Sequence, residues 1–306
     1  MRAHAIILVF TLGILNSCAG LQKEATVMSQ PVEIPFRYFE GSFMVVPVKI
    51  NGSISQDFIF DTGIGMNLIS KSLCQQLGCS ERGKHTGKRM SGQEVTISMT
   101  SIASFAMGGK ELKDVPIGIF DMEALMPGAN IGGFLSLGFF KDLPYSVDYE
   151  RQVITFESSD SLQKIRGEGT VIPLSIDQQG DAFGVFLPLI LPNGQKISVE
   201  VDTGSQALIL HERYMLPLGI SPTDPKVKRK DGKDETGHRY SRFFTTLAGT
   251  VHLPGSPKMK VTSPTVMFQK IIYDGLVGHD FLKQFRVTYD IPKSEMIFRK
   301  PAGGNK

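Results

Sequence analysis

The sequence predicts an all-β protein made of two homologous β-rich lobes, with only short helices. Three observations predict this class. The 306 residues include 32 Gly, 17 Pro and 20 Phe, which indicates many turns between short strands and disfavours a helical bundle or a disordered chain. The chain also repeats its landmarks once along its length. Each copy contains an Asn-Gly pair, the strongest short-range signal for a β-hairpin.

The charge balance excludes one class of partner. The chain has 33 Lys and Arg against 30 Asp and Glu, which gives a formal net charge of +3. So small a basic excess provides neither the electrostatic footprint of a nucleic-acid-binding protein nor a polybasic membrane arm. We therefore expect no nucleic-acid partner.

Residues 1–17 have the pattern of a secretory signal peptide. Arg2 precedes an apolar stretch over residues 5–15, which is too short to span a bilayer. The segment ends in Leu15-Asn16-Ser17-Cys18. This ending resembles the lipobox of bacterial lipoproteins, and the resemblance implies that Cys18 is lipidated and becomes the new N-terminus. A plain signal peptide followed by a chance Cys is the alternative.

A lipidated Cys18 places the protein on a membrane of the bacterial cell envelope, at the outer membrane or the periplasmic face. Residues 19–30 are mostly small and polar and show no apolar periodicity. We therefore expect a flexible tether over 18–35, followed by the folded lobes.

Each half of the chain then predicts a strand, a tight turn and a second strand that ends at an Asp-Thr-Gly triplet. The strands are expected over 43–50 and 57–60 in the first half, and over 185–191 and 197–201 in the second. The turns contain Asn51-Gly52 and Asn193-Gly194, and the triplets are Asp61-Thr62-Gly63 and Asp202-Thr203-Gly204. The two Asp residues stand 141 positions apart.

Downstream of each triplet, the sequence predicts a short helix that ends before a glycine. The helices are expected over 70–77 and 211–216. Gly78 and Gly219 follow them and suit the left-handed position after a helix end.

The repeat continues to the end of each half. An apolar element over 133–136 matches 275–278, and a closing hairpin over 147–156 matches 289–298. We assign the N-terminal lobe to 36–160 and the C-terminal lobe to 168–300. The polar run at 158–168 has little apolar content, so we expect a soft crossing between the lobes there.

The paired triplets indicate acid–base chemistry. Gly63 and Gly204 allow a sharp turn after an apolar strand, so a pseudo-twofold axis could bring Asp61 and Asp202 together. Two carboxyl groups that close cannot both ionise, so they share a proton and one pKa rises. The ionised Asp can then take a proton from a water while the protonated one donates to a carbonyl oxygen. This chemistry requires neither a metal nor a cofactor.

An apolar strand, Asp-Thr-Gly, a short helix and an apolar-apolar-Gly element resemble the aspartic proteases, specifically bacterial retropepsin-like domains arranged as a pepsin-like tandem. The resemblance covers residues 43–298. It implies two acid-protease-like β-barrel lobes related by a pseudo-twofold axis, with Asp61 and Asp202 as the catalytic dyad. It also implies that Thr62 and Thr203 bond across the lobe interface, and that the second apolar-apolar-Gly element packs under the catalytic loop. The supporting residues are Thr62, Gly63, Thr203, Gly204 and Ser205.

Two positions depart from the family pattern. Ile64 follows the first triplet, where pepsin-like chains usually have a hydroxyl residue, whereas Ser205 follows the second. Ser136 replaces the glycine of the first apolar-apolar-Gly element. From this asymmetry we predict that Asp202 is the better hydrogen-bonded and more readily ionised carboxyl, and that Asp61 is more often protonated.

The sequence leaves open which hairpin covers the substrate and whether two cysteines are bridged. Either of the Gly-rich segments 82–95 and 228–240 could be the hairpin that covers the substrate, or both could be solvated loops. Cys74 and Cys79 could be bridged or free. His279 is expected to be a packed or surface residue rather than a catalyst.

The resemblance predicts an aspartic endopeptidase that accepts an extended peptide or protein substrate between its lobes. We expect a monomer with intramolecular lobe pairing, and a domain-exchanged dimer is the alternative. The rival function is a lipoprotein that keeps the protease fold and binds peptides or envelope components without cutting them. Ile64 and Ser136 favour that rival, whereas the intact triplets oppose it.

Overall fold

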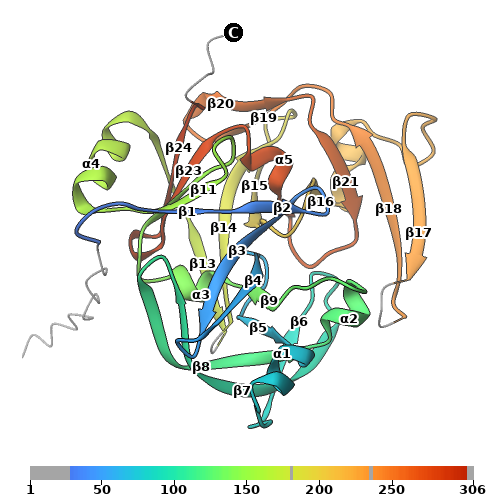
Figure 1. The fold of residues 1–306 in the computed structure, drawn as a ribbon. Helices are drawn as coiled ribbons and strands as arrows, with labels where there is room; N and C mark the ends of the chain where they lie inside the picture. Colours follow the sequence, from blue (N-terminus) through green and yellow to red (C-terminus); the bar gives the residue numbers. More distant parts are fainter. Residues whose placement is uncertain (1–27, 180–181, 234–236, 302–306) are drawn as a thin grey trace, which may run out of the picture.

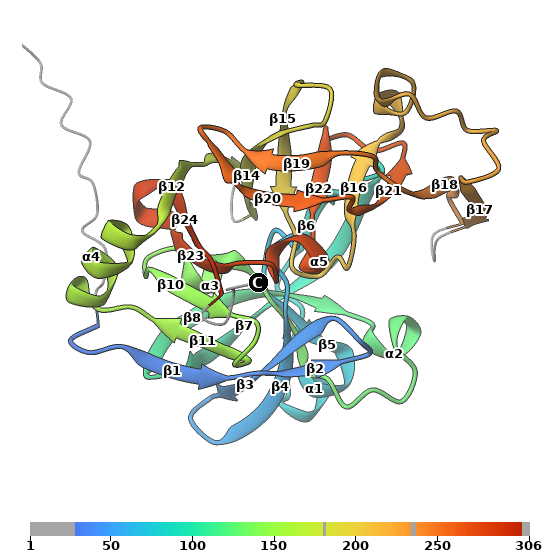
Figure 2. The same ribbon diagram turned by 90° about the horizontal axis from the view of Figure 1, so that it is seen from above.

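Three β-sheets organise the computed structural model, which describes residues 28–179, 182–233 and 237–301 (Figure 1). One sheet belongs to each half of the chain, and a third sheet is built by both halves. In Figure 2 the first lobe lies below, the second lobe lies above, and the shared sheet joins them. The predicted all-β, two-lobed class is confirmed. The predicted signal peptide and Cys18 lie outside the described residues.

The first lobe contains an eight-stranded sheet in the order β2-β3-β4-β9-β5-β8-β7-β6. Its strands are β2 (Arg37–Phe39), β3 (Phe43–Ile50), β4 (Ile54–Phe60), β5 (Leu68–Ser70), β6 (Lys84–Lys88), β7 (Glu94–Met107), β8 (Lys110–Phe120) and β9 (Gly133–Leu135). Its helices are α1 (Lys71–Gln76), α2 (Met122–Leu125) and α3 (Leu137–Phe140).

The second lobe contains a larger sheet in the order β17-β18-β21-β16-β22-β15-β14-β19-β20, with β13 also paired to β14. Its strands are β13 (Ser175–Gln179), β14 (Ala182–Ile190), β15 (Lys196–Val201), β16 (Leu208–His211), β17 (Lys228–Lys233), β18 (Arg239–Thr246), β19 (Thr250–Leu253), β20 (Ser256–Thr262), β21 (Thr265–Gln269) and β22 (Gly275–Val277). Its helical turns are η1 (Glu212–Tyr214), η2 (Leu216–Leu218) and α5 (His279–Leu282).

The two lobes repeat one pairing pattern. The β3–β4 hairpin of the first lobe matches the β14–β15 hairpin of the second, and each second strand pairs in parallel with a later strand, β9 or β22. Likewise β5 pairs in parallel with β8, as β16 does with β21. The internal repeat of the sequence therefore corresponds to a repeated topology.

The expected short helices are present. Helix α1 begins after Ser70, whose side chain accepts a hydrogen bond from the amide of Leu73, and it is followed by Gly78 with a φ of 67°. In the second lobe the corresponding stretch forms the two 3₁₀ turns η1 and η2, capped by Gly219 with a φ of 72°. None of the helices in the described part of the chain has the length and apolarity that a membrane span requires.

The closing hairpins of both lobes meet in the shared sheet, in the order β1-β11-β10-β23-β24-β12. Its elements are β1 (Val32–Pro35), β10 (Tyr145–Asp148), β11 (Val153–Phe156), β12 (Thr170–Pro173), β23 (Arg286–Asp290), β24 (Glu295–Arg299) and the turn η3 (Ile291–Lys293). Strand β10 pairs antiparallel with β23, and the rings of Tyr145 and Tyr289 stack 4.7 Å apart at the junction. Such antiparallel pairing of equivalent strands is what a pseudo-twofold axis between the lobes produces.

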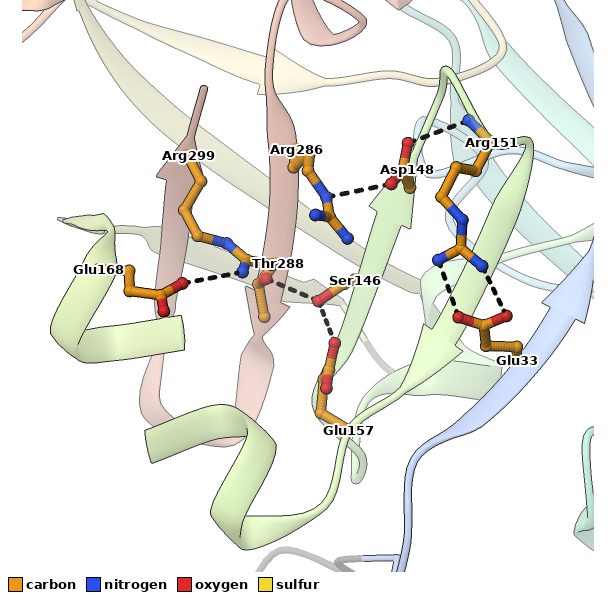
Figure 3. A network of polar contacts seen from close by, with 9 residues as sticks. All are labelled: Glu33, Ser146, Asp148, Arg151, Glu157, Glu168, Arg286, Thr288 and Arg299. Atoms are coloured by element: carbon orange, nitrogen blue, oxygen red, sulfur yellow. Dashed lines mark hydrogen bonds and ion pairs between the residues drawn. The ribbon is translucent and has the colours of Figure 1, made fainter. Parts of the chain in front are cut away.

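Polar contacts join the two halves of this sheet (Figure 3). Ser146 on β10 and Thr288 on β23 hydrogen-bond through their hydroxyls over 2.7 Å, and Ser146 also donates to Glu157. Arg286 of the second lobe approaches Asp148 of the first to 3.0 Å. The crossing between lobes is therefore stabilised by buried and half-buried polar pairs as well as by apolar packing.

Two boundary predictions are wrong. The tether was predicted to reach residue 35, but Val32–Pro35 forms β1 and pairs with β11. The soft crossing predicted at 158–168 is the helix α4 (Ser159–Glu168), which begins with a capping box between Ser158 and Ser161. Helix α4 packs Leu162 and Ile165 against Ile297 of the second lobe, so a regular element connects the lobes.

Candidate active site

The two triplets follow equivalent strands. Strand β4 ends at Phe60 and β15 ends at Val201, so Asp61 and Asp202 are the first residues beyond them. The amide of each Asp donates to the end of the neighbouring parallel strand, Asp61 to the carbonyl of Leu135 and Asp202 to that of Val277, both over 3.0 Å. The ends of paired strands, rather than free loops, therefore position both carboxyls.

Thr62 and Thr203 bond reciprocally across the lobe interface. The amide of Thr62 donates to Oγ1 of Thr203 over 3.0 Å, and the amide of Thr203 donates to Oγ1 of Thr62 over 2.9 Å. The Thr62 hydroxyl donates to the carbonyl of Val201 over 2.6 Å, and the Thr203 hydroxyl donates to that of Phe60 over 3.0 Å. Both threonines are almost completely buried. These four bonds hold the two triplets in one symmetric arrangement.

Gly63 and Gly204 leave the space that the opposite carboxyl occupies. A Cβ atom on Gly63 would lie 2.5 Å from Cγ of Asp202, and one on Gly204 would lie 2.5 Å from Cγ of Asp61. Real Cβ atoms do not approach so closely. Each glycine is therefore needed for close approach of the two lobes rather than for an unusual φ.

The carboxyls of Asp61 and Asp202 share a hydrogen bond, and both have raised pKa values. Burial is the main cause for each, because it disfavours the charged form. The pKa of Asp202 lies well above its ordinary value because the charges of Asp61 and Glu200 add to the effect of burial. Hydrogen bonds from the amides of Gly63, Ile64 and Gly204 counteract the rise in the pKa of Asp61.

The raised pKa of Asp202 favours the opposite assignment of the two carboxyls from the one predicted. Asp202 does accept the amides of Gly204 and Ser205, over 2.9 and 3.1 Å. However, the Ser205 hydroxyl donates to the carbonyl of Ala207, over 3.4 Å, instead of to Asp202. Burial and two neighbouring acids raise the pKa of Asp202, so we assign the shared proton to Asp202 and the charge to Asp61.

The two departures from the family pattern are accommodated by packing. Ile64 lies against the apolar cluster that contains Val45 and Ile59. Ser136 is fully buried, and both its amide and its hydroxyl donate to Oδ1 of Asn67, over 2.8 and 3.1 Å. Both side chains thus find their partners within the first lobe.

Of the two candidate covering hairpins, β6–β7 of the first lobe reaches the second lobe (Figure 2). At its tip, the carbonyl of Met90 accepts a hydrogen bond from the amide of Ile272 over 2.8 Å. The Met90 side chain packs against a second-lobe cluster that includes Ile209 and Leu276. This segment corresponds to the predicted 82–95 region, and its tip contacts the second lobe.

Glu200 is a site residue that the sequence analysis missed. It lies on β15, two residues before Asp202, and only 7% of it is exposed. Burial first, and then the charges of Asp61 and Asp177, raise its pKa to about 8. One signal was available: Glu200 interrupts an otherwise apolar strand end, at the position equivalent to Ile59 in the first lobe.

The remaining candidates lie outside the dyad. Cys74 and Cys79 are both free thiols, and burial raises the pKa of Cys74 to about 12. His279 is buried against the rings of Tyr38 and Tyr149, as expected of a packed residue. Among the residues that the structure describes, no cluster of three potential metal ligands occurs.

Part of the chain matches a known protein family. Residues 46–139 match the family model of the aspartyl proteases, which covers β3, the first triplet and β9. The matched segment, less than half of the chain, supports an aspartyl-protease-like fold. No curated protein sequence matches the chain.

Solved structures share the whole fold at low sequence identity. Basic 7S globulin from soybean has a TM-score of 0.53 and 10% identity, with 89% of this chain and 96% of that chain covered. Conglutin gamma, a basic 7S globulin from lupine seeds, has a TM-score of 0.52 and 11% identity, with 88% and 95% covered. The protein titled edgp has a TM-score of 0.51 and 11% identity, with 90% and 96% covered. At these identities the likeness shows the fold alone.

Proposed function

We propose that the protein is an aspartic endopeptidase in which Asp61 and Asp202 hydrolyse peptide bonds. The observation that carries the proposal is the reciprocal arrangement of the triplets. Each glycine makes room for the opposite carboxyl, and each threonine bonds to the opposite strand. A fold that only binds peptides has no chemical need for two carboxyls that share a proton.

The dyad suits the two proton transfers of hydrolysis. Asp61, the ionised member, takes a proton from a water held between the carboxyls, and the resulting hydroxyl attacks the scissile carbonyl carbon. Asp202, the protonated member, donates its proton to the carbonyl oxygen, which gives a neutral diol. Collapse of the diol breaks the C–N bond, Asp61 passes its proton to the leaving nitrogen, and Asp202 recovers a proton from a diol hydroxyl. Protons balance, and no covalent intermediate forms.

The β6–β7 hairpin supplies the cover that this chemistry needs. Its tip rests on the second lobe through Met90 and Ile272, so an extended peptide enters when the tip lifts and lies beneath it when the tip returns. Exclusion of water then strengthens the electrostatic interactions within the cleft.

Cleavage of denatured casein from acid to neutral pH tests the proposal. The full chain, solubilised in detergent, is compared with Asp61→Asn, Asp202→Asn and a control, Asp160→Asn, whose side chain is exposed on α4. We expect pepstatin-sensitive cleavage that falls by about 10³-fold or more in either dyad variant and is unchanged in the control. Activity that survives both dyad substitutions refutes the mechanism. Absence of cleavage at every pH favours the peptide-binding rival.

We also propose that the protein is a monomer anchored to the bacterial cell envelope by lipid on Cys18. The support is the sequence ending at Cys18. Cys18→Ser should move the protein from the membrane fraction to the soluble fraction, because the acyl chains provide the membrane affinity. Retention of the variant in the membrane fraction refutes the anchor.

A further inference from the structure

Glu200 lies on the face of its strand that also carries the dyad. Side chains alternate along β15, and Ile197, Val199 and Val201 all point into the main apolar core. Glu200 and Asp202 therefore point to the opposite face. The charge of Asp61, in the other lobe, raises the pKa of Glu200, and the charge of Glu200 raises the pKa of Asp202.

This carboxyl is buried without a counter-ion. Only 7% of Glu200 is exposed, and among the described residues no hydrogen bond or ion pair to its side chain is found. Buried carboxylates are normally paired, because an unpaired one loses its hydration without compensation. An unpaired acid at this position therefore indicates a group that a ligand completes.

Acidic and aromatic side chains surround Glu200. Phe186 lies opposite Glu200 on β14, and its ring contacts that of Tyr273 at 5.1 Å. Gly184 lies beside the acid, since a Cβ there would lie 3.4 Å from Oε1 of Glu200. Asp177 pairs with Gly184 on the adjacent strand β13, and its charge raises the pKa of Glu200. A long aliphatic stem that ends in a cation suits such surroundings.

The equivalent position of the first lobe has apolar surroundings instead of acidic ones. Ile59 occupies the position of Glu200, opposite Val45 and beside Phe134. These three residues belong to one apolar cluster that also contains Met66 and Leu68. The two sides of the dyad therefore offer different environments to the residues that flank a scissile bond.

We propose that Glu200 is a specificity-determining residue that binds a lysine or arginine side chain of the substrate on the second-lobe side of the scissile bond. The residue on the first-lobe side is apolar. The inference rests on the proposed peptidase function, and it adds the class of substrate. A bound cation beside Glu200 favours the ionised carboxyl, which releases its proton to solvent as the ion pair forms, while the aliphatic stem packs along Phe186 and Tyr273.

Matched peptides test the proposal. Cleavage sites in casein are first located by mass spectrometry. Peptides are then made with lysine or norleucine, which has a similar stem without the charge, at each position that flanks the scissile bond. The ratio of kcat/KM values for the two peptides is measured for the wild type, Glu200→Gln, Glu200→Ile and a control, Glu111→Gln, whose side chain is exposed on β8.

We expect the wild type to favour lysine by about 10- to 100-fold at one of the two flanking positions. Glu200→Gln should reduce the ratio to about one, and Glu200→Ile, which copies the first lobe, should favour norleucine. The control should keep the wild-type ratio. A wild type that cleaves peptides without a lysine preference, or a preference that survives Glu200→Gln, overturns the proposal while the peptidase function stands.

Binding separates the two proposals if the wild type cleaves no peptide. Peptides that tile the casein sequence, each made with lysine or norleucine at its central position and carrying a fluorophore, are then titrated against wild type and Glu200→Gln by fluorescence anisotropy. Lysine-selective binding that is lost in Glu200→Gln refutes the peptidase and retains the subsite. Equal binding of both peptides overturns both.

Discussion

The element beneath each triplet is packed differently in the two lobes. In the second lobe, the carbonyl oxygens of Ser205 and Ala207 crowd Gly278, so that a Cβ there would lie 2.7 Å from the Ala207 oxygen and still closer to that of Ser205. The first lobe has Ser136 at this place, and Asn67 accepts both its amide and its hydroxyl. One backbone topology thus permits two local solutions, a close main-chain contact or a buried side-chain pair.

The same contrast extends to the face beside the dyad. The first lobe presents Ile59 within an apolar cluster, whereas the second presents the unpaired acid Glu200. Features that hold the carboxyls together, namely the threonines and glycines of the triplets, are symmetric. In the proposed peptidase, catalysis therefore depends on the symmetric features, while the asymmetric ones set proton affinity and substrate choice.

The largest expected effect comes from breaking the symmetric part. Gly63→Ala and Gly204→Ala each place a methyl group where the opposite carboxyl lies, so the dyad must separate. We expect either variant to lose about 10²-fold or more in kcat/KM, because misplaced catalytic groups lose their shared geometry. The control is Gly167→Ala on α4, where the new methyl group meets nothing within 4 Å. Equal activity of Gly63→Ala and the control would contradict the close approach of the lobes.

A second test concerns the pH dependence of stability. Glu200 has a pKa of about 8 in the folded protein against an ordinary value of 4.5, so the folded state holds this proton more tightly. The stabilisation is complete below about pH 4.5 and is lost as the pH rises through about 8. The titratable groups that face it, Asp61, Asp202, Asp177 and Tyr273, are retained in the Glu200→Gln variant.

Urea unfolding at pH 5 and pH 8.5 measures this difference. Between these values the free energy of unfolding of the wild type should fall by roughly 2 to 4 kcal/mol more than that of Glu200→Gln. Ile59→Val in the first lobe changes no titratable group, so the free energy of unfolding of this variant should depend on pH as that of the wild type does. Parallel curves for wild type and Glu200→Gln would show that Glu200 ionises normally in the folded protein.

Substitutions of Gly278 and Ser136, the residues beneath the two triplets, should have a smaller effect. Gly278→Ala forces a methyl group against two carbonyl oxygens of the catalytic loop and should cost about 1 to 3 kcal/mol in stability, together with activity. Ser136→Gly removes the hydroxyl that caps α3 through the amide of Gly138, at a cost of about 1 kcal/mol, and should leave kcat/KM near wild type. Urea unfolding and peptide kinetics on both variants test the asymmetry. A Gly278→Ala variant that is more stable than Ser136→Gly contradicts it.

Much of the fold could be predicted from the sequence because it depends on local patterns. Alternating apolar strands, Asn-Gly turns and the two triplets recur in register, and the resulting hairpins and their pairing follow. Helix α4 was missed because its ten residues bury only Leu162 and Ile165, so that little apolar periodicity is visible. Its capping box uses Ser161 where Glu or Gln is the usual signal.

The electrostatics of the site could not be predicted in the same way. The protonation order of Asp61 and Asp202 depends on burial and on Glu200, which acts through space from another strand. The contact of Met90 with Ile272 joins residues of different lobes, and no periodic pattern records such a contact. The internal repeat thus predicts that equivalent groups of the two halves come together. The effects of distant charges and the contacts of the hairpin tip depend on how the two lobes pack, so the sequence does not reveal them.

The smallest expected effect sharpens the comparison at the residue after each triplet. The first lobe has Ile64 and the second has Ser205, whose hydroxyl donates to the carbonyl of Ala207 rather than to Asp202. Only the amide of Ser205 reaches the dyad, and alanine keeps that amide. Ser205→Ala should therefore keep kcat/KM within about twofold of wild type, with an unchanged pH profile. A tenfold loss with a displaced pH profile would mean that the hydroxyl turns to Asp202 during catalysis, because a lost hydrogen bond of that size is worth about 1.4 kcal/mol.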